Sequence, residues 1–327
     1  MNFQNLKIRL LRKISILTNK LWIFRVIRRF QGLNIASDVT MDIQGSFSHG
    51  NKVYIGKGTT IVVHRSGALE LGDACYIGNN VEISPDSKII IGNKSSIQHR
   101  STILGDVEIG KYCLFSYNVY ISSGQHNFDV APHVNIKDQD FMAMQNSENS
   151  GLHNKVYIGD DCWVGTNVVI MRGITIGKGA IIGANTLVTR DVEPYTILSG
   201  SPGKVIARRL NFIPPKKISY LIEEELPYFY SGFSTSLSEM ESDGIRADRK
   251  FTIFMDTSGA KSVHLRFKPL KINGVNLCLN GTYNANLPCN VGQISYKLDR
   301  SIDNKLTFSL SSDQPFGSFL LQEVWVG

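Results

Sequence analysis

The residues with the clearest chemical potential lie in one short polar segment. His126 and Asp129 stand close together there, and His133 follows them. Imidazole is the usual general base in enzymes, because its pKa lies near neutral pH and it can take a proton from a weak nucleophile such as a hydroxyl. A nearby carboxylate could orient that base or bind a polar ligand, so Asp129 is a candidate for either role.

A repeat of six residues runs through the first two thirds of the chain. Ile109 follows Ile91 by 18 residues, and Ile176 follows Ile158 by the same number, so each step holds three six-residue units. A period of six residues is typical of a parallel β-helix. The aliphatic–glycine pairs that mark the repeat are Ile55-Gly56, Leu71-Gly72, Ile91-Gly92, Ile109-Gly110, Ile158-Gly159 and Ile176-Gly177.

The repeat predicts coils of three short strands and three corners. The first position of each unit is aliphatic and the fifth is small or β-branched, so the aliphatic residues would stack along the axis. Glycine and asparagine at the corners tolerate positive φ. The alternative, a pair of β-sandwiches with chance glycine spacing, does not place an aliphatic residue at every sixth position. We therefore expect an all-β protein whose main domain is a parallel β-helix.

One large interruption breaks the repeat. A further step of 18 from Ile109 would start a coil at residue 127, yet the next aliphatic–glycine pair begins at Ile158. About 31 residues are therefore inserted, over roughly 127–155. Long loops inside compact arrays are usually functional or disordered. His126 stands directly at this break.

The cysteines point to packing rather than to a metal site. Cys75, Cys113 and Cys162 all occupy the small fifth position of a unit, which predicts that they are buried in the core. Zinc sites need closely paired ligands, which this spacing does not supply, so no metal is predicted. Five cysteines, three of them in the core, suit a reducing cytoplasm.

The N-terminal segment carries the net charge of +7. Residues 1–30 are rich in lysine and arginine, contain no acidic residue, and have apolar residues every three or four positions. Such a basic amphipathic helix predicts peripheral binding to the inner face of the cytoplasmic membrane. The alternative is a helix packed on the prism or in an oligomer interface. Charges interrupt every apolar run, so a transmembrane span is excluded, and nucleic-acid binding is not expected.

The stretch from Tyr157 to Leu210 contains the phrases CWVGTNVVI, GANTLVTRDV and SGSPGKVIARR, and ISSGQHNFD precedes it. These phrases resemble the hexapeptide-repeat acyltransferases, in the branch of galactoside, maltose and surface-polysaccharide O-acetyltransferases. The resemblance covers about residues 45–210. It implies a left-handed parallel β-helix, a homotrimer, acetyl-CoA as donor, and active sites shared between neighbouring subunits.

The resemblance also implies roles for individual residues. His126 would be the general base, Trp163 an aromatic beside the acyl group, and the backbone N–H of Thr166 the donor to the oxyanion. Asn118 matches a substrate-contacting asparagine, although it could equally be a corner residue in the left-handed conformation, and Trp163 could simply cover the prism wall. The residues expected to bind the acceptor are Asn118, Asp129 and His133.

Coenzyme A would lie along the last coils. In the family, backbone groups line the pantetheine arm and basic side chains neutralise the phosphates. Arg190 stands where relatives often carry lysine, which should serve a phosphate equally well. The matching positions are Gly165, Gly183, Ala184, Thr189, Arg190, Lys204 and Arg208.

The chain beyond the repeat predicts a second domain. Residues 216–226 have the pattern of a short amphipathic helix, and residues 228–250 that of a linker. Short alternating runs separated by turn signals then predict an antiparallel β-sandwich. The expected order is a basic helix (1–30), a β-helix acyltransferase domain (31–213), a helix and linker (214–250), and a small β-sandwich (251–327).

These observations favour an acetyl-CoA-dependent O-acetyltransferase that modifies a sugar hydroxyl of a surface polysaccharide such as capsule or O-antigen. An N-acetyltransferase of a nucleotide-linked amino sugar would need an N-terminal nucleotide-binding domain, for which residues 1–45 are too short. Acetylation of an antibiotic and a non-catalytic glycan-binding trimer stay open. A metal-dependent hydratase on the same fold would need three converging histidines, which the spacing does not provide.

Overall fold

The computed structural model describes residues 32–145, 154–211, 213–233, 243–269, 276–279, 283–286, 292–298, 304–311 and 319–327. The basic segment 1–30, predicted as an amphipathic helix, lies outside these residues. Two compact units divide the chain, Met1–Arg209 and Leu210–Gly327, and each is described by itself. No helix in the described ranges has the length and apolar character needed to cross a membrane.

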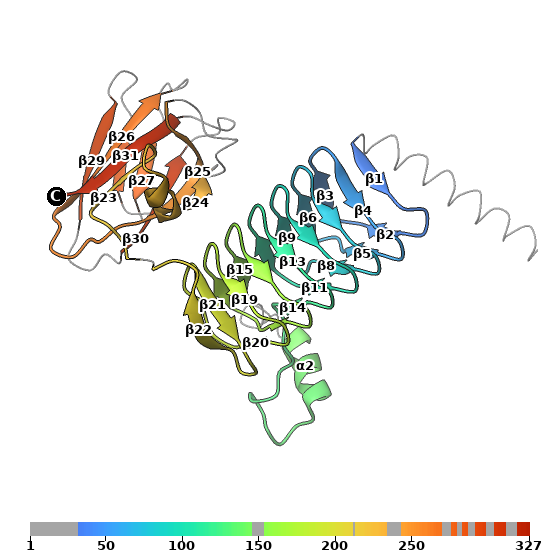
Figure 1. Cartoon of the computed structure of the whole chain (residues 1–327). Coiled ribbons are helices and arrows are strands. Elements are labelled where there is room, and N and C mark those ends of the chain that lie inside the picture. Colours follow the sequence, from blue (N-terminus) through green and yellow to red (C-terminus); the bar gives the residue numbers. More distant parts are fainter. Residues whose placement is uncertain are drawn as a thin grey trace, which may run out of the picture. The chain divides into compact units, whose positions relative to one another are not determined.

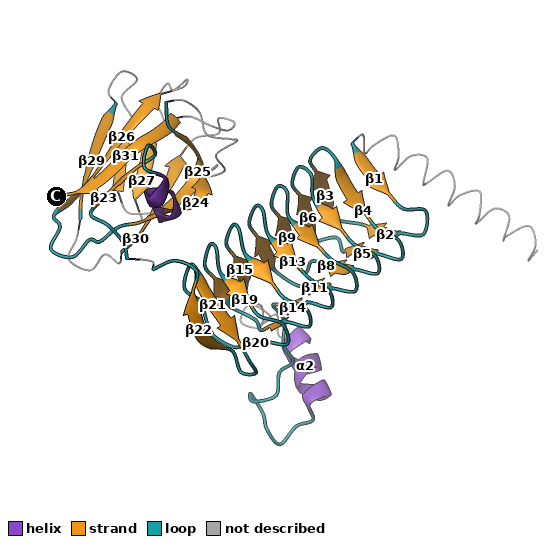
Figure 2. Cartoon of the chain, viewed as in Figure 1, coloured by secondary structure: helices purple, strands orange, loops and turns teal. Residues whose placement is uncertain are grey.

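The first unit is a parallel β-helix, as the repeat predicted (Figures 1 and 2). Each coil contributes one strand to each of three sheets, and neighbouring coils pair in parallel; only the last pair, β21 with β22, is antiparallel. Sheet A runs β1 (Leu33–Ile35), β4 (Val53–Ile55), β7 (Tyr76–Ile77), β10 (Ser96–Ile97), β13 (Leu114–Phe115), β16 (Trp163–Val164), β19 (Ile181–Ile182), β21 (Thr196–Ser199) and β22 (Lys204–Arg208). Sheet B runs β2 (Thr40–Ile43), β5 (Thr60–Val63), β8 (Glu82–Ser84), β11 (Thr102–Leu104), β14 (Tyr120–Ser122), β17 (Val169–Ile170) and β20 (Leu187–Val188). Sheet C runs β3 (Ser46–His49), β6 (Ala68–Leu71), β9 (Lys88–Ile91), β12 (Val107–Ile109), β15 (Val156–Ile158) and β18 (Thr175–Ile176).

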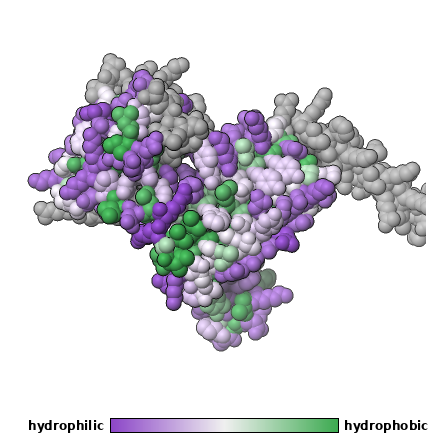
Figure 3. All heavy atoms as spheres, viewed as in Figure 1, coloured by the Kyte–Doolittle hydropathy of each residue, from purple (hydrophilic) through white to green (hydrophobic). Residues whose placement is uncertain are grey.

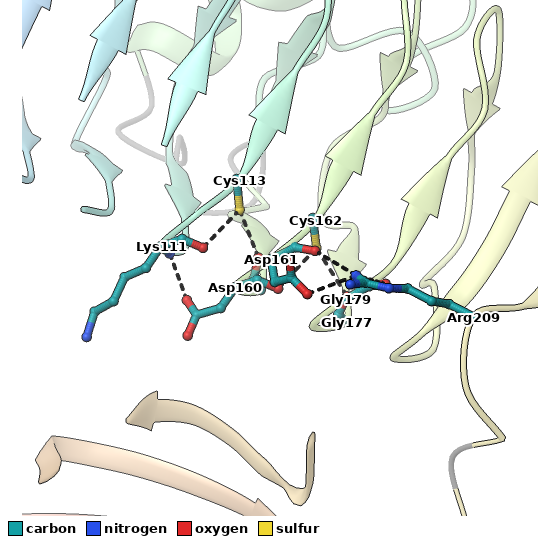
Figure 4. Close-up of polar contacts among 9 residues, drawn as sticks. Lys111, Cys113, Asp160, Asp161, Cys162, Gly177, Gly179 and Arg209 are labelled. Atoms are coloured by element: carbon teal, nitrogen blue, oxygen red, sulfur yellow. Dashed lines mark hydrogen bonds and ion pairs between the residues drawn. The ribbon is translucent and has the colours of Figure 1, made fainter. Parts of the chain in front are cut away.

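The core is formed by side chains at equivalent positions of successive coils, stacked along the axis of the prism. In sheet A, Ile77 is in register with Ile97, and Ile97 with Phe115, and all three side chains are buried. The cysteines lie in the core as predicted: the Cys113 thiol donates to the Gly159 carbonyl at 3.1 Å, and the Cys162 thiol to that of Gly177 at 3.3 Å (Figure 4). Stacking therefore buries apolar faces that no single coil could bury alone.

The corner between sheets A and B holds a column of residues with positive φ, here called the A/B corner column. It consists of Gly58, Asn80, Arg100, Asn118, Asn167 and Asn185, with φ between 54° and 67°. Asparagine reaches this conformation at low cost, because its short side chain can hydrogen-bond locally. The Asn118 amide donates to Asn167 Oδ1 at 3.0 Å, and the Asn167 amide donates to Asn185 Oδ1 at 2.9 Å. This ladder ties successive coils together.

The insertion leaves the prism after β14 and returns at β15, at the corner between sheets B and C. It contains helix α2 (Ile136–Gln145), which the sequence reading did not anticipate (Figure 1). Six of the ten helix residues are alanine, lysine, methionine or glutamine, which are good helix formers, and Asp138 is acidic in the first turn. The segment before the helix packs on it: the buried Gln139 accepts from the Ala131 N–H and donates to the Val134 carbonyl.

The second unit is an antiparallel β-sandwich, as predicted. One layer contains β23, β31, β26 and β29, the other contains β24, β30, β27 and β28, and β25 pairs with strands of both. The strands are β23 (Lys217–Ser219), β24 (Phe229–Phe233), β25 (Ile245–Phe254), β26 (Ser262–Pro269), β27 (Asn276–Leu279), β28 (Tyr283–Asn286), β29 (Gln293–Lys297), β30 (Lys305–Ser311) and β31 (Phe319–Val326).

The segment expected as a helix and linker instead belongs to the sandwich. Residues 216–226 were predicted as a helix, but Lys217–Ser219 forms β23 and pairs with β31, followed by the 3-10 helix η2 (Glu223–Tyr228). Long-range pairing and complete burial of Ile218 override the local helical pattern. Within the expected linker, β24 buries Phe229 and Phe233 against Phe251.

Candidate active site

The histidine at the break of the repeat has a carboxylate partner. His126 Nδ1 lies 2.6 Å from Asp140 Oδ2, and the imidazole is 82% exposed while the carboxylate is only 23% exposed. The other carboxylate oxygen, Oδ1, accepts from the Asn127 backbone N–H at 2.8 Å and from its side-chain amide at 3.2 Å. The imidazole of His126 is therefore open to solvent on one side and held by a carboxylate on the other.

The surroundings of Asp140 keep it ionised. Its pKa is lowered from the usual value, first by the hydrogen bond from the Asn127 backbone and then by the bond to His126. A carboxylate accepts hydrogen bonds and cannot donate one, so the proton between the two groups is on His126 Nδ1. Neutral His126 therefore carries a free lone pair on Nε2, which is the tautomer a general base needs.

The sequence predicted His126 as a general base but did not predict its carboxylate partner. Asp129 was a candidate to orient His126, yet it is exposed on the loop, as is His133, and the residue that contacts the imidazole is Asp140. Asp140 lies 14 positions further along the chain, on helix α2. The acidic residues Asp138 and Asp140 were only a weak signal of a partner for His126. Without knowledge of the helix, no sequence spacing predicts that residue 140 lies next to residue 126.

A second group of candidate residues lies where sheet A turns into sheet B. Gly165 begins this corner, and a side chain there would meet the Ala184 backbone nitrogen at 2.6 Å, so only glycine fits. In two earlier coils the equivalent N–H group has a side-chain acceptor: Lys57 N–H donates to Asn79 Oδ1, and Asn79 N–H to His99 Nδ1.

The Thr166 N–H differs from these earlier N–H groups. Its counterpart in the next coil is Ala184, whose side chain has no acceptor, so no described side chain of that coil can accept the Thr166 N–H. An unpaired backbone donor at a half-exposed corner is the group that stabilises a developing oxyanion. The geometry is thus compatible with the role that the sequence assigned to Thr166.

Asn118 lies at the corner between sheets A and B, and Trp163 lies on sheet A. Both ends of the Asn118 amide are engaged, since Oδ1 accepts from Arg100 Nε at 3.0 Å and the amide nitrogen donates to Asn167. Trp163 lies on the outer face of sheet A, in register with Leu114 and Ile181, and is 52% exposed. Asn118 is thus a corner residue whatever else it does, and Trp163 offers an uncovered aromatic surface.

The residues expected to bind coenzyme A follow along the last coils. Ala184, Thr189 and Arg190 are exposed, and a side chain at Gly183 would meet Ser199 Oγ at 2.8 Å. Lys204 and Arg208 begin and end β22, whose residues are all exposed. Figure 3 shows apolar side chains gathered over β21 and β22 beside hydrophilic ones.

The end of β22 is fixed to the prism by Arg209. Its guanidinium donates to Asp161 Oδ2 at 2.8 Å (Figure 4), and its backbone N–H donates to the Tyr195 carbonyl. Lys178 is buried near the same corner, 4% exposed, and burial lowers its pKa to about 8, although Asp160 and Asp161 oppose that shift. The strand that carries Lys204 and Arg208 is therefore anchored to the prism.

One chain does not bring the two groups of residues together. His126 and Asp140 belong to the corner between sheets B and C, whereas Thr166 and Trp163 belong to sheet A and its corner with sheet B. In a three-sided prism, the corner between sheets B and C lies opposite sheet A. A site that uses both groups needs residues from two copies of the chain.

Comparison with known proteins places the repeat among transferases. The family model described as bacterial transferase hexapeptide (six repeats) matches residues 155–190. A probable macrolide acetyltransferase of Lysinibacillus sphaericus is 37% identical over 136 residues, which cover 40% of this chain and 74% of that protein. A chloramphenicol acetyltransferase of Agrobacterium fabrum is 54% identical over 54 residues, covering 16% of this chain and only 26% of that relative.

Solved structures with a similar fold include two acetyltransferases. The polySia-specific acetyltransferase NeuO has a TM-score of 0.35 at 21% identity, over 56% of this chain and 90% of that one. A maltose O-acetyltransferase from Clostridium difficile 630 has a TM-score of 0.28 at 22% identity, over 52% of this chain and 70% of that one.

Proposed function

Because the chain belongs to the hexapeptide-repeat acyltransferase family, we propose that it transfers an acetyl group from acetyl-CoA to a sugar hydroxyl of a bacterial surface polysaccharide. The observation that carries the proposal is the His126–Asp140 pair at the single large interruption of the coils. An exposed imidazole with Nδ1 tied to a carboxylate has the geometry of a general base for a hydroxyl nucleophile.

The reaction proceeds by direct transfer in a ternary complex. His126 Nε2 takes the proton of the acceptor hydroxyl as its oxygen attacks the thioester carbonyl carbon. Asp140 stabilises the imidazolium that forms and holds the ring in place through the 2.6 Å contact at Nδ1. A positioned base of this kind contributes about 10²–10⁴-fold to the rate.

The tetrahedral intermediate places a negative charge on the former carbonyl oxygen. The Thr166 N–H donates to that oxygen, and Trp163 covers the acyl group. The carbon–sulfur bond then breaks, and the proton on His126 Nε2 passes to the sulfur of coenzyme A. The products are the acetyl ester and free coenzyme A, and His126 returns to its neutral form.

Coenzyme A lies along the last coils in this proposal. Gly165, Gly183 and Ala184 allow the pantetheine arm to approach the backbone closely. The cations expected to neutralise the phosphates are Arg190, Lys204 and Arg208, and Arg209 anchors the strand that carries the last two. Thr189 adds a hydroxyl donor on the same side.

The site is completed by a second copy of the chain. His126 and Asp140 of one subunit would meet Thr166 and Trp163 of a neighbour, because one prism holds the two pairs at different corners. A homotrimer closes this arrangement with three equivalent sites. The loop residues Asp129 and His133, together with Asn118, would contact the acceptor at that junction.

A large acceptor is favoured over a small sugar for two reasons. The insertion with helix α2 and the β-sandwich provide surface beyond what one monosaccharide needs, and the basic segment 1–30 would bring the protein to membrane-attached glycan precursors at the cytoplasmic face. That segment lies outside the described residues, so its role is tested by deletion: vesicle binding at low salt should fall when residues 1–30 are removed.

The second candidate is acetylation of an antibiotic hydroxyl. It is favoured by the names of the curated relatives, chloramphenicol and macrolide acetyltransferases. The chemistry at His126 would be identical, and only the acceptor would differ. A panel of purified surface glycans, chloramphenicol and a macrolide, each incubated with radiolabelled acetyl-CoA, separates the two. Label in the glycan supports the proposal, and label only in an antibiotic overturns it.

A further inference from the structure

One residue in the A/B corner column differs from all the others. The column is glycine or asparagine at every coil except one, where Arg100 adopts φ of 60°. A long side chain in the left-handed conformation costs about 1 kcal/mol or more, and the coils before and after use asparagine, Asn80 and Asn118. The chain thus places a cation at a corner where its own pattern calls for an amide.

The arginine is held in place without being neutralised. Its Nε donates to Asn118 Oδ1 at 3.0 Å, which orients the guanidinium along the column. Among the described residues it forms no ion pair, and its two terminal nitrogens have no hydrogen-bond partner. A guanidinium that is fixed at Nε and open at Nη1 and Nη2 presents the planar fork that binds a carboxylate.

The neighbouring side chains add uncharged donors. His99 Nδ1 accepts the Asn79 N–H at 2.6 Å, so the proton of the neutral ring is on Nε2 and that nitrogen can donate. Tyr117 contacts the His99 ring edge-on, at 5.1 Å between centroids, and is 42% exposed. Arginine, tyrosine and histidine therefore form one polar surface in two successive coils.

That surface lies next to the proposed reaction centre. The coil of Tyr117 directly precedes that of Thr166, and the coil of Arg100 lies one further away. Neighbouring strands are about 4.8 Å apart, so Arg100 is about 10 Å from the oxyanion donor. This is the span of one or two sugar units.

We propose that Arg100 binds a carboxylate of the acceptor, so that the substrate is an acidic glycan. The inference rests on the proposed function, because it places the acceptor at the corner that holds Thr166.

The matched variant is Arg100→Asn, since asparagine is the residue that the chain uses at this position in adjacent coils and it keeps the left-handed turn. Lys94→Asn is the control: Lys94 is also a cation at a corner with φ of 58°, but on the corner between sheets C and A.

The test measures binding separately from transfer. Oligogalacturonate and a hyaluronan oligosaccharide are titrated into the full-length protein saturated with coenzyme A, beside their carboxyl-reduced counterparts. The wild type and Lys94→Asn should bind at least one acidic form about 10- to 100-fold more tightly than its reduced form, and Arg100→Asn should abolish that difference.

Several outcomes would overturn the carboxylate site. One is equal affinity of the wild type for the acidic and the reduced forms, and another is an acid preference that survives in Arg100→Asn. A third is a rise in the Kd for coenzyme A in that variant, which would assign Arg100 to a phosphate. The proposed function is judged independently by acetyl transfer. A wild type that transfers acetyl but binds acidic and reduced forms equally rejects only the Arg100 proposal, whereas acid-selective binding without transfer rejects only the enzymatic proposal.

Discussion

Replacing Asp140 by asparagine probes the structural basis of the proposed base. Two donors, His126 Nδ1–H and the Asn127 backbone N–H, each bind a different oxygen of the carboxylate, at 2.6 and 2.8 Å. An amide offers one oxygen and one NH₂ group, so Asp140→Asn can accept from only one of the two donors. The variant must leave one of the two N–H groups unpaired, or donate its own NH₂ to Nδ1 and hold the imidazole in the tautomer that carries the proton on Nε2 and cannot act as a base.

The size of the effect follows from the exposure of the pair. A hydrogen bond to an ionised group is about twice as strong as one between neutral groups, and its loss is expected to lower kcat by about 10- to 100-fold. Because the imidazole is 82% exposed, water screens the charge, and the lower half of this range is expected. The loss should appear in kcat, since Asp140 acts through His126 and does not contact either substrate.

The assay is acetyl transfer from acetyl-CoA, followed through release of the free thiol, with coenzyme A binding measured in parallel. Asp138→Asn is the matched control, because it makes the same change on helix α2, where among the described residues the carboxylate accepts from the Asn135 amide alone. Its kcat should stay within about twofold of the wild type. In a His126→Ala background, Asp140→Asn should cost nothing further. Normal kcat in Asp140→Asn, or an additive loss in the double variant, would refute the positioning role.

Three further changes test other parts of the structure. Gly165→Ala places a methyl group 2.6 Å from the Ala184 nitrogen, so kcat should fall at least about 10-fold as the Thr166 N–H shifts; unchanged transfer would remove Thr166 from the site. Asn167→Ala removes two hydrogen bonds of the asparagine ladder and a residue that adopts the left-handed conformation at low cost. The free energy of unfolding, measured by urea titration, should therefore fall by about 2 kcal/mol. An unchanged value would show that the ladder does not stabilise the fold. Burial lowers the pKa of Lys178 from 10.5 to about 8. Between these pH values the unfolded chain therefore holds a proton that the folded chain has released, so folding becomes more favourable as the pH rises. The stability of the wild type relative to Lys178→Met should therefore increase by up to about 3 kcal/mol above pH 8, and a constant difference would contradict the depressed pKa.

The β-helix could be predicted because its rule is local and repeated. The 18-residue step from Ile91 to Ile109 reappears as a register pair between adjacent strands, and the same spacing located the insertion. The burial of Cys113 and Cys162 followed from the same positions. The left hand of the helix came from the family resemblance, because spacing alone does not determine it.

The features that sequence reasoning missed depend on contacts between distant residues. Asp140 reaches His126 only because helix α2 folds back on the loop, and no periodicity reports that. Lys217 pairs with Trp325 from the other end of its unit, so a segment with helical spacing becomes an edge strand. Asn118 fits the family position for substrate contact, but its amide also belongs to a ladder that only the stacked coils reveal.

The most direct test of the central claim is acetyl transfer to a purified surface glycan. The glycan is incubated with acetyl-CoA and either the wild-type protein or His126→Ala, then examined by mass spectrometry and NMR for O-acetyl groups. The wild type should add acetyl esters, and His126→Ala should do so at least about 100-fold more slowly while still binding coenzyme A. Equal acetylation by both proteins would contradict the account, as would a wild type that binds coenzyme A yet leaves the glycan unmodified.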